Sequence, residues 1–197
     1  MSLAYAILSI LNVAPMTGYD LKHEAFDATV QHFWPADQSQ IYRTLARLAE
    51  QGHVTMTVEP QDERPDRKVY SITPEGQAAL GEWLREPQTP PTLRDPFLVQ
   101  TYFGMEVPND ELRALVEARL THHHARLAEL RSIPIPSTSD RPRDRWLALQ
   151  HLTLDYGLAL EETNIAWLER CLAVLDALPE PDEVEDFRTR FSSPTEG

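Results

Sequence analysis

The sequence is poor in cysteine and glycine and has no long apolar segment. A single cysteine, Cys171, excludes an internal disulfide, and its apolar neighbours at helical spacing favour a buried side chain over a reactive thiol. Only seven glycines in 197 residues disfavour a sheet-rich fold and favour long helices. No apolar run approaches the ~20 residues that a membrane helix needs, and the apolar N-terminus lacks the basic leader of a signal peptide. We therefore expect a cytoplasmic protein with no membrane partner.

Basic side chains are also in the minority. The chain has 18 Lys and Arg against 31 Asp and Glu, which gives a net charge of −13. Such a charge, taken alone, argues against a nucleic-acid partner. The acidic excess is concentrated downstream, because residues 73–197 contain 22 of the acidic side chains. A local basic patch is sufficient for DNA binding, so the composition does not exclude it.

Proline clusters divide the chain into two parts and a tail. Residues 86–91 contain three prolines, which cannot continue a helix. We predict a first domain over residues 1–86, a second over 92–180 and an acidic tail over 181–197. A further break is expected within the second domain at 133–140, a segment rich in proline and serine.

Three helical segments open the first domain. Residues 2–12 have apolar side chains at helical spacing, and Thr17 with Asp20 forms a capping-box pattern that predicts the start of a second helix. A third helix is predicted over residues 38–51, with Gly52 at its C′ position. The apolar positions of this helix are Ile41, Leu45, Leu48 and Ala49, and the first three of these are expected to face inward.

After the third helix, the spacing of the apolar side chains changes from that of a helix to that of a strand. Residues 53–58 and 69–72 alternate in polarity, as half-buried strands do, and a charged turn over 61–68 joins them. Thr73 followed by Pro74 predicts the N-cap of a fourth helix. Three helices, a hairpin and a helix form the order of a winged helix-turn-helix. In that fold the third helix enters the major groove of DNA, and the hairpin, the wing, contacts the flanking backbone.

The third helix and the wing carry the candidate DNA contacts. Glutamine pairs with adenine, and arginine pairs with guanine or phosphate. Tyr42 either donates its hydroxyl to a phosphate or packs against the hairpin, and Thr44 is also expected to face outward. The wing cations have acidic neighbours, so a solvated turn of mixed charge is the alternative there. The candidate DNA-binding residues are Gln38, Ser39, Gln40, Tyr42, Arg43, Arg47, Arg64, Arg67 and Lys68.

These segments resemble the PadR family of transcriptional regulators. Residues 41–48 with 51–52 resemble that family's recognition helix, and residues 64–76 resemble its wing and following helix. Residues 3–11 and 17–21 match its first two helices. The wing departs from the family pattern in its acidic side chains. The resemblance implies a sequence-specific regulator that binds double-stranded DNA, with repression as the expected effect.

The second domain has two long segments with apolar stripes. One helix is expected to begin at Asn109, as its N-cap, and to reach Leu130; a longer one is expected from about Arg143 to Leu178. The expected stripe of the longer helix is Trp146, Leu149, Leu152, Tyr156, Leu160, Trp167, Cys171, Val174 and Leu178. Helices of this length cannot bury such stripes alone, so we expect an antiparallel pair that is completed by a second copy. A monomeric helical subdomain is the alternative.

The expected fold class is therefore mostly α, with an N-terminal winged helix-turn-helix and a C-terminal long-helix dimerisation domain. This plan is similar to the longer PadR subfamily, which includes the virulence activator AphA. A homodimer would match two half-sites of an inverted repeat. The alternative function is a helical protein-interaction module whose winged domain binds protein, which the acidic net charge favours.

Catalysis, metals and cofactors are not expected. The sequence has no nucleophile motif and no phosphate-binding glycine loop. His122, His123 and His124 are consecutive and would point about 100° apart on a helix, so they do not converge on one ion. Four tryptophans are more typical of core packing, although a cavity for a small aromatic effector is an open alternative. They are Trp34, Trp83, Trp146 and Trp167.

Overall fold

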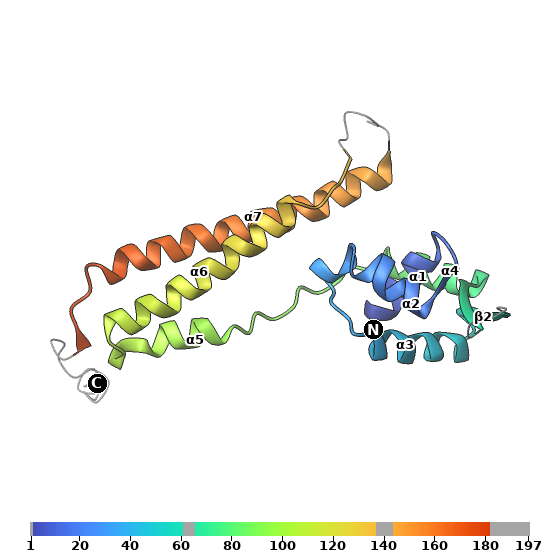
Figure 1. The fold of residues 1–197 in the computed structure, drawn as a ribbon, viewed down its shortest axis with the longest axis horizontal. Coiled ribbons are helices and arrows are strands. Elements are labelled where there is room, and N and C mark those ends of the chain that lie inside the picture. Colours follow the sequence, from blue (N-terminus) through green and yellow to red (C-terminus); the bar gives the residue numbers. More distant parts are fainter. Residues whose placement is uncertain (1, 61–65, 137–143, 182–197) are drawn as a thin grey trace, which may run out of the picture. The chain divides into compact units, whose positions relative to one another are not determined.

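The computed structural model describes residues 2–60, 66–136 and 144–181, which form two compact units (Figure 1). The first unit spans residues 1–91 and the second 92–197. The predicted fold class, mostly α with a winged helix-turn-helix followed by long helices, is confirmed. Among the described helices, none is both long and apolar enough to cross a bilayer.

The first unit combines short helices with a small antiparallel sheet. Its strands lie in the order β1 (Met16–Thr17), β3 (Arg67–Ile72), β2 (Val54–Glu59). Strands β2 and β3 form the wing. Strand β1 was not predicted, because two residues carry no recognisable period. The helical elements, in chain order, are α1 (Ser2–Leu11), α2 (Gly18–Asp20), the π-helical turn η1 (Leu21–Phe26), the 3-10 turn η2 (Val30–His32), α3 (Gln38–Glu50) and α4 (Pro74–Trp83).

Capping signals in the sequence determine where α2 and α4 begin. The Thr17 hydroxyl accepts the Asp20 N–H at 3.1 Å, and the Asp20 carboxylate accepts the Thr17 N–H at 3.3 Å, so the predicted capping box is confirmed. The Thr73 hydroxyl accepts the Gly76 N–H at 3.0 Å, and Pro74 occupies the first turn of α4.

Gly52 ends α3. It has a φ of 74°, in the left-handed region that glycine adopts without strain. This conformation lets the His53 N–H donate to the Leu48 carbonyl at 2.9 Å. The Gly52 N–H donates to the Ala49 carbonyl at 3.0 Å, which completes a Schellman motif with glycine at C′, as the sequence predicts.

The core of the first unit forms where α1, η1, α3 and α4 meet. The predicted burial of Ile41, Leu45 and Leu48 is confirmed, but Ala49 is exposed. The prediction that Thr44 faces outward is wrong. Positions 41, 44, 45 and 48 share one face of a helix, so Thr44 is buried and its hydroxyl donates to the Gln40 carbonyl at 2.7 Å.

The second unit consists of α5 (Pro96–Phe103), the 3-10 turn η3 (Gly104–Glu106), α6 (Asn109–Arg131) and α7 (Arg145–Leu175). Helices α6 and α7 lie antiparallel, because Arg113 pairs with Asp176 while Arg131 pairs with Glu162 (Figure 1). Helix α5 was not predicted, although Asp95 followed by Pro96 carries the same cap-and-proline signal as the start of α4.

Asn109 does not cap α6 as predicted. Pro108 occupies the N-cap position, and Asn109 is the first helical residue. The Asn109 side-chain amide instead donates to the carbonyls of Leu178, at 2.8 Å, and Pro179, at 3.3 Å. A contact with the chain beyond α7 therefore replaces the local cap.

Helix α7 has two apolar faces. Its buried side chains are Leu147, Ile165 and Leu168, which pack within the unit. The predicted stripe lies mainly on another side of the helix, away from these buried side chains. The members of that stripe exposed on α7 are Trp146, Leu149, Leu152, Tyr156, Leu160 and Val174, and Leu178, which the predicted helix included, is exposed beyond the end of α7.

Candidate nucleic-acid interface

The first turn of α3 is fixed by a second capping box. The Asp37 carboxylate accepts the Gln40 N–H at 2.7 Å, and the Gln40 side-chain oxygen accepts the Asp37 N–H at 3.0 Å. The Ser39 hydroxyl donates to the same carboxylate at 2.7 Å. The hydrogen bond from Ser39, together with the Gln40 N–H, holds the pKa of Asp37 below its ordinary value. Two predicted DNA contacts, Ser39 and Gln40, therefore also shape the helix start.

The outward side of α3 lies opposite its buried side. Positions 39, 43, 46 and 50 recur along it at helical spacing, with positions 42 and 47 beside them. Ala46 is exposed there, and only this spacing would have identified it in advance. A methyl side chain allows close approach to base edges and suits contact with a thymine methyl. The six predicted DNA-binding residues of α3, all exposed, are Gln38, Ser39, Gln40, Tyr42, Arg43 and Arg47.

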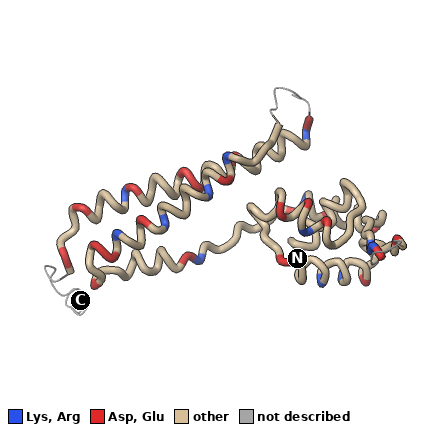
Figure 2. Tube along the Cα trace, in the orientation of Figure 1, with Lys and Arg blue, Asp and Glu red and all other residues tan. Residues whose placement is uncertain are grey.

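Two arginines supply the positive charge of α3 (Figure 2). The Arg43 Nε–H donates to the Ser39 carbonyl at 3.3 Å, which leaves both Nη groups for a bidentate contact with guanine or phosphate. Within the described part of the chain, neither Arg43 nor Arg47 pairs with an acidic side chain. Both charges are therefore available to a partner.

Tyr42 projects from α3 toward the start of α2. A Cβ added at Gly18 would come within 2.4 Å of Tyr42 Cε1, so the ring packs directly on this glycine. The side chain remains 40% exposed. Tyr42 thus packs against α2 and still presents its edge to solvent. It borders a concave surface lined by Thr17, Gly18, Tyr19, Asp20, Tyr42, Asp66, Arg67 and Lys68.

The predicted wing cations have different surroundings. Arg67, the first residue of β3, places its Nη2 3.1 Å from Asp20 Oδ2. Lys68 is exposed and has no acidic partner among the described residues. Arg64 lies outside the described residues. Burial raises the pKa of Asp20, but hydrogen bonds from Thr17 and the charge of Arg67 outweigh it, so the pKa lies below its ordinary value.

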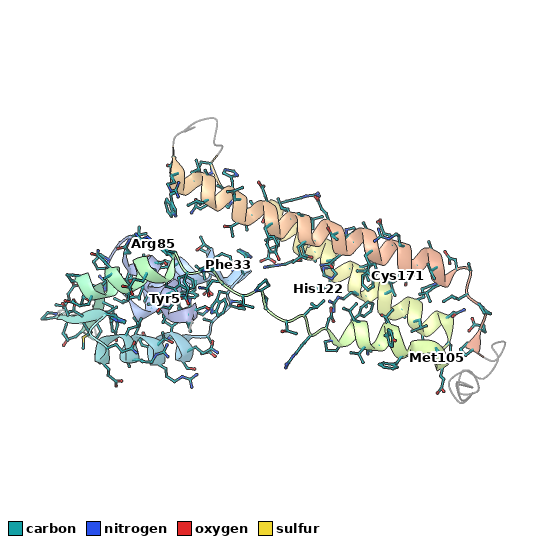
Figure 3. All side chains as sticks on the ribbon, turned by 180° about the vertical axis from the view of Figure 1, so that it is seen from behind. Tyr5, Phe33, Arg85, Met105, His122 and Cys171 are labelled. Carbon is teal, nitrogen blue, oxygen red and sulfur yellow. The ribbon has the colours of Figure 1, made fainter. Side chains whose placement is uncertain are left out.

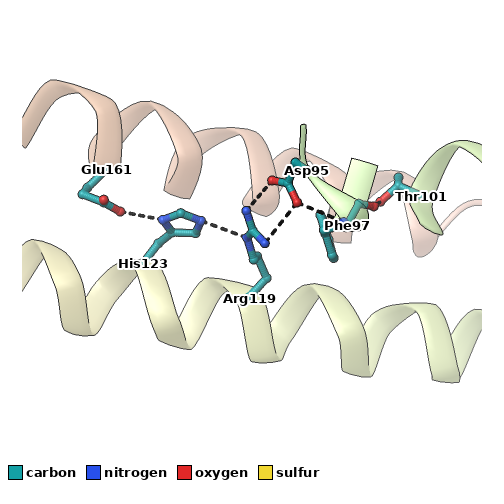
Figure 4. Close-up of polar contacts among 6 residues, drawn as sticks. All are labelled: Asp95, Phe97, Thr101, Arg119, His123 and Glu161. Atoms are coloured by element: carbon teal, nitrogen blue, oxygen red, sulfur yellow. Dashed lines mark hydrogen bonds and ion pairs between the residues drawn. The ribbon is translucent and has the colours of Figure 1, made fainter. Parts of the chain in front are cut away.

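The histidine run on α6 forms a packing contact. His122 is exposed (Figure 3), whereas His123 is buried. The Arg119 Nε–H donates to His123 Nε2 at 3.1 Å, so the ring proton lies on Nδ1 and is donated to Glu161 at 2.5 Å (Figure 4). Arg119 also pairs with Asp95, which caps α5. These contacts join α5, α6 and α7. No group of three His, Cys, Asp or Glu among the described residues is placed to hold a metal ion.

The tryptophans of the first unit have separate surroundings. Trp83 stacks on Tyr5 with ring centroids 4.6 Å apart, which confirms core packing for Trp83. Trp34 is exposed and borders a groove of about 740 Å³ beside α3 that does not include Trp83. The groove is lined by Leu3, Phe33, Trp34, Pro35, Gln40, Arg43, Thr44 and Arg47.

The tryptophans of the second unit are also separate. Trp167 packs edge-on against Phe97 with ring centroids 6.0 Å apart, so core packing is confirmed there too. Trp146 is exposed and precedes Trp167 by about 30 Å along α7 at 1.5 Å per residue. Cys171 packs against the same cluster as Trp167, and burial raises the pKa of its thiol, as expected for a packing residue.

Comparison with protein families matches both units. The family described as "Transcriptional regulator PadR-like family" matches residues 7–82, and "Virulence activator alpha C-term" matches residues 93–176. The negative transcriptional regulator PadR of Bacillus subtilis (strain 168) is 30% identical over 182 residues, which cover 88% of this chain and 97% of that protein.

Solved structures give the same result over nearly the whole length. Bacillus subtilis PadR in complex with operator DNA has a TM-score of 0.74 at 29% identity and covers 89% of this chain and 99% of its own. The structure of the same protein with p-coumaric acid gives the same values. The Vibrio cholerae virulence activator AphA has a TM-score of 0.69 at 31% identity and covers 90% of this chain and 99% of its own.

Proposed function

Since the chain belongs to the PadR-like family of transcriptional regulators, we propose that it binds double-stranded operator DNA as a homodimer, sequence-specifically. The observation that carries the proposal is the outward side of α3, where Arg43 and Arg47 are exposed and unpaired within the described residues. Repression is the proposed effect, because the Bacillus subtilis relative is a negative regulator. A cytoplasmic location and the lack of a catalytic role belong to the same proposal.

Each exposed side chain of this face suits a particular contact. Arg43 offers its two Nη groups to guanine, and Ala46 lies where a thymine methyl would fit. Gln38 suits adenine better than Gln40 does, because the Gln40 side-chain oxygen already accepts the Asp37 N–H. The proposed phosphate contacts are Ser39, Tyr42, Arg47 and the wing cations Arg64 and Lys68.

The α7 stripe supports the homodimer. Its large apolar side chains are solvent-exposed in a single chain, with Leu152 65% and Tyr156 72% exposed. An apolar stripe of this length on a soluble helix is costly unless a partner covers it. A two-fold dimer would cover it with the same surface of the second copy and would present two α3 helices to two half-sites.

Selection from a random pool of duplexes tests the proposal, and recovery of an inverted repeat is the expected result. Affinity for the selected duplex should fall with salt. The proposed phosphate-contacting cations Arg47, Arg64 and Lys68, in two protomers, would release counterions from about six phosphates, which predicts a slope of log affinity against log salt of about −5. The alternative, a winged domain that binds protein, predicts no enriched duplex and no such slope.

Arg43→Ala tests whether the outward side of α3 is the face that reads DNA, called the reading face below. Loss of a bidentate base contact should weaken binding to the selected duplex by about tenfold and relax the preference at one base pair. Arg85→Ala is the matched control, because Arg85 is exposed in the same unit but lies after α4 and donates to the Gly81 carbonyl. Equal losses in the two variants would contradict the assignment.

Leu152→Glu tests the dimer surface. A carboxylate at the centre of the stripe should give a monomer in light scattering, with weaker DNA binding. Ala148→Glu, at an exposed position beside the stripe on the same helix, should remain dimeric. A dimeric Leu152→Glu variant would remove the stripe from the proposal.

A small aromatic effector is a second part of the proposal, because the Bacillus subtilis relative has been solved with p-coumaric acid. The groove beside α3 offers Phe33 and Trp34 to an aromatic ring and Arg43 to a carboxylate. A ligand there would cover part of the reading face. Addition of p-coumarate should quench tryptophan fluorescence and release DNA, and Trp34→Phe should lose the quenching. Quenching that persists in Trp34→Phe would rule out this groove.

A further inference from the structure

Two cations start strand β3, and only one has an acidic partner. Arg67 pairs with Asp20 at 3.1 Å, while Lys68 is exposed without such a partner in the described part of the chain. Successive side chains of a strand point to opposite faces, so the two cations cannot share one role. The charge of Arg67 is largely matched within the protein.

Asp20 is held firmly in place. Its carboxylate closes the capping box with Thr17, and its side chain is 20% exposed. Thr17 belongs to β1, which pairs with β3 at Thr17↔Val69 and Met16↔Tyr70. Asp20 therefore projects from α2, which directly follows the strand that is paired with the central strand of the sheet.

The ion pair extends this attachment toward the wing tip. The pairing of β1 with β3 stops at Val69, and Arg67 lies two residues farther along β3 in the direction of the tip. Among the described residues, the ion pair of Arg67 with Asp20 joins β3 beyond Val69 to α2, in addition to the pairing of β3 with β2. This contact lies where it can influence how the wing is oriented on the body of the domain.

We propose that Asp20 is a positioning residue for DNA binding: it holds Arg67 and thereby orients the wing, and Lys68 makes the phosphate contact. The inference rests on the proposed function and changes the role predicted for Arg67. A partly exposed ion pair contributes little to stability, and the Arg67 side chain is 46% exposed. Loss of the ion pair is therefore expected to change the orientation of the wing in the DNA complex and to leave the stability of the protein nearly unchanged.

Salt dependence separates an orienting cation from one that binds phosphate. The probe is the duplex selected above, with the full-length dimer. Lys68→Ala should make the salt slope less steep by about 2 for the dimer, because each lost phosphate contact removes about 0.9. Arg67→Ala should weaken binding about fivefold, because the wing must then be oriented on the DNA at a cost in free energy, and it should leave the slope unchanged, because Lys68 still reaches its phosphate in the complex. An equal change of slope in the two variants would overturn the proposal.

Paired substitutions test whether Asp20 and Arg67 act together. Asp20→Asn keeps an oxygen for the Thr17 N–H and removes only the charge, so it should weaken binding about as much as Arg67→Ala. The double variant should bind no more weakly than either single variant, because each removes the same ion pair. A double variant whose fold-loss of affinity equals the product of the two single fold-losses would overturn the proposal.

A charge exchange gives the sharpest comparison. Arg67→Asp alone and Asp20→Arg alone should each weaken binding, and the double variant should bind more tightly than either, since the pair forms again with reversed signs although the carboxylate of the capping box is lost. If Arg67 bound phosphate itself, the carboxylate in its place would keep the double variant weak, and that result would refute the orienting role. A wild-type protein that selects no duplex would instead contradict the proposed function, so the two failures are distinguishable.

Discussion

Replacement of Gly18 by alanine should weaken DNA binding with little change in stability. The new Cβ would lie 2.4 Å from Tyr42 Cε1, 2.7 Å from Cζ and 3.0 Å from Oη. Carbon atoms in contact are about 3.5–4.0 Å apart, so the ring must move by roughly 1 Å or more. Because Tyr42 is 40% exposed, the ring can turn toward solvent without entering the core.

Two opposing effects set the free energy of unfolding of this variant. Loss of the ring contact with residue 18 costs on the order of 1 kcal/mol. Gly18 lies in the first turn of α2 and has no positive φ, so alanine also restricts the unfolded chain and contributes about 0.4–1 kcal/mol of stability. The net change should stay within about 1 kcal/mol of zero. The displaced Tyr42, however, should lower the affinity for the selected duplex by about tenfold.

Fluorescence anisotropy and thermal unfolding of the same samples check both halves of this prediction. Gly81→Ala is the control, because a Cβ there meets only Arg85 Nη1, at 3.3 Å, and its affinity should equal that of the wild type. The Gly18→Ala/Tyr42→Ala double variant should bind no more weakly than Tyr42→Ala. Wild-type affinity in Gly18→Ala would show that the position of Tyr42 does not matter for DNA binding.

Two further predictions concern stability. Leu168 is fully buried against Phe97 and Val116, so Leu168→Ala should lower the free energy of unfolding by about 2–5 kcal/mol in chemical denaturation; an unchanged midpoint would contradict this packing. The lowered pKa of Asp20 predicts stability that is present above the unfolded pKa near 4 and is lost as pH falls through the folded pKa. Wild-type protein should therefore lose more stability than Asp20→Asn as the pH falls below about 5, and parallel curves of stability against pH would count against the contacts of the Asp20 carboxylate with Thr17 and Arg67.

Local signals made much of the first unit predictable. Thr17, Thr73 and Gly52 act on neighbours within a few residues, so their roles follow from the sequence alone. The outward positions of α3 follow from helical spacing once its buried face is known. Thr44 shows the limit of this reasoning, because its polarity suggested exposure and its position imposed burial.

Contacts between distant segments escaped prediction for a physical reason. Asn109 has the residue type of an N-cap, but it bonds to carbonyls about seventy residues away, which no local pattern specifies. Helix α7 has apolar side chains on two sides, so its sequence alone cannot say which side meets α6 and which needs a partner. The pairing of Asp20 with Arg67 likewise depends on how β1 meets β3.

The acidity of the chain is compatible with DNA binding because of where its carboxylates lie. Asp37 and Asp20 both belong to the domain that carries the reading face, and each is engaged by hydrogen bonds at a helix start. Their charges thus stabilise helix ends and orient a cation instead of standing free before the phosphates. The remaining acidic excess repels DNA at a distance and lowers non-specific affinity. Under the proposed function, discrimination between sequences then depends on the few contacts of α3 that only a matched operator can complete.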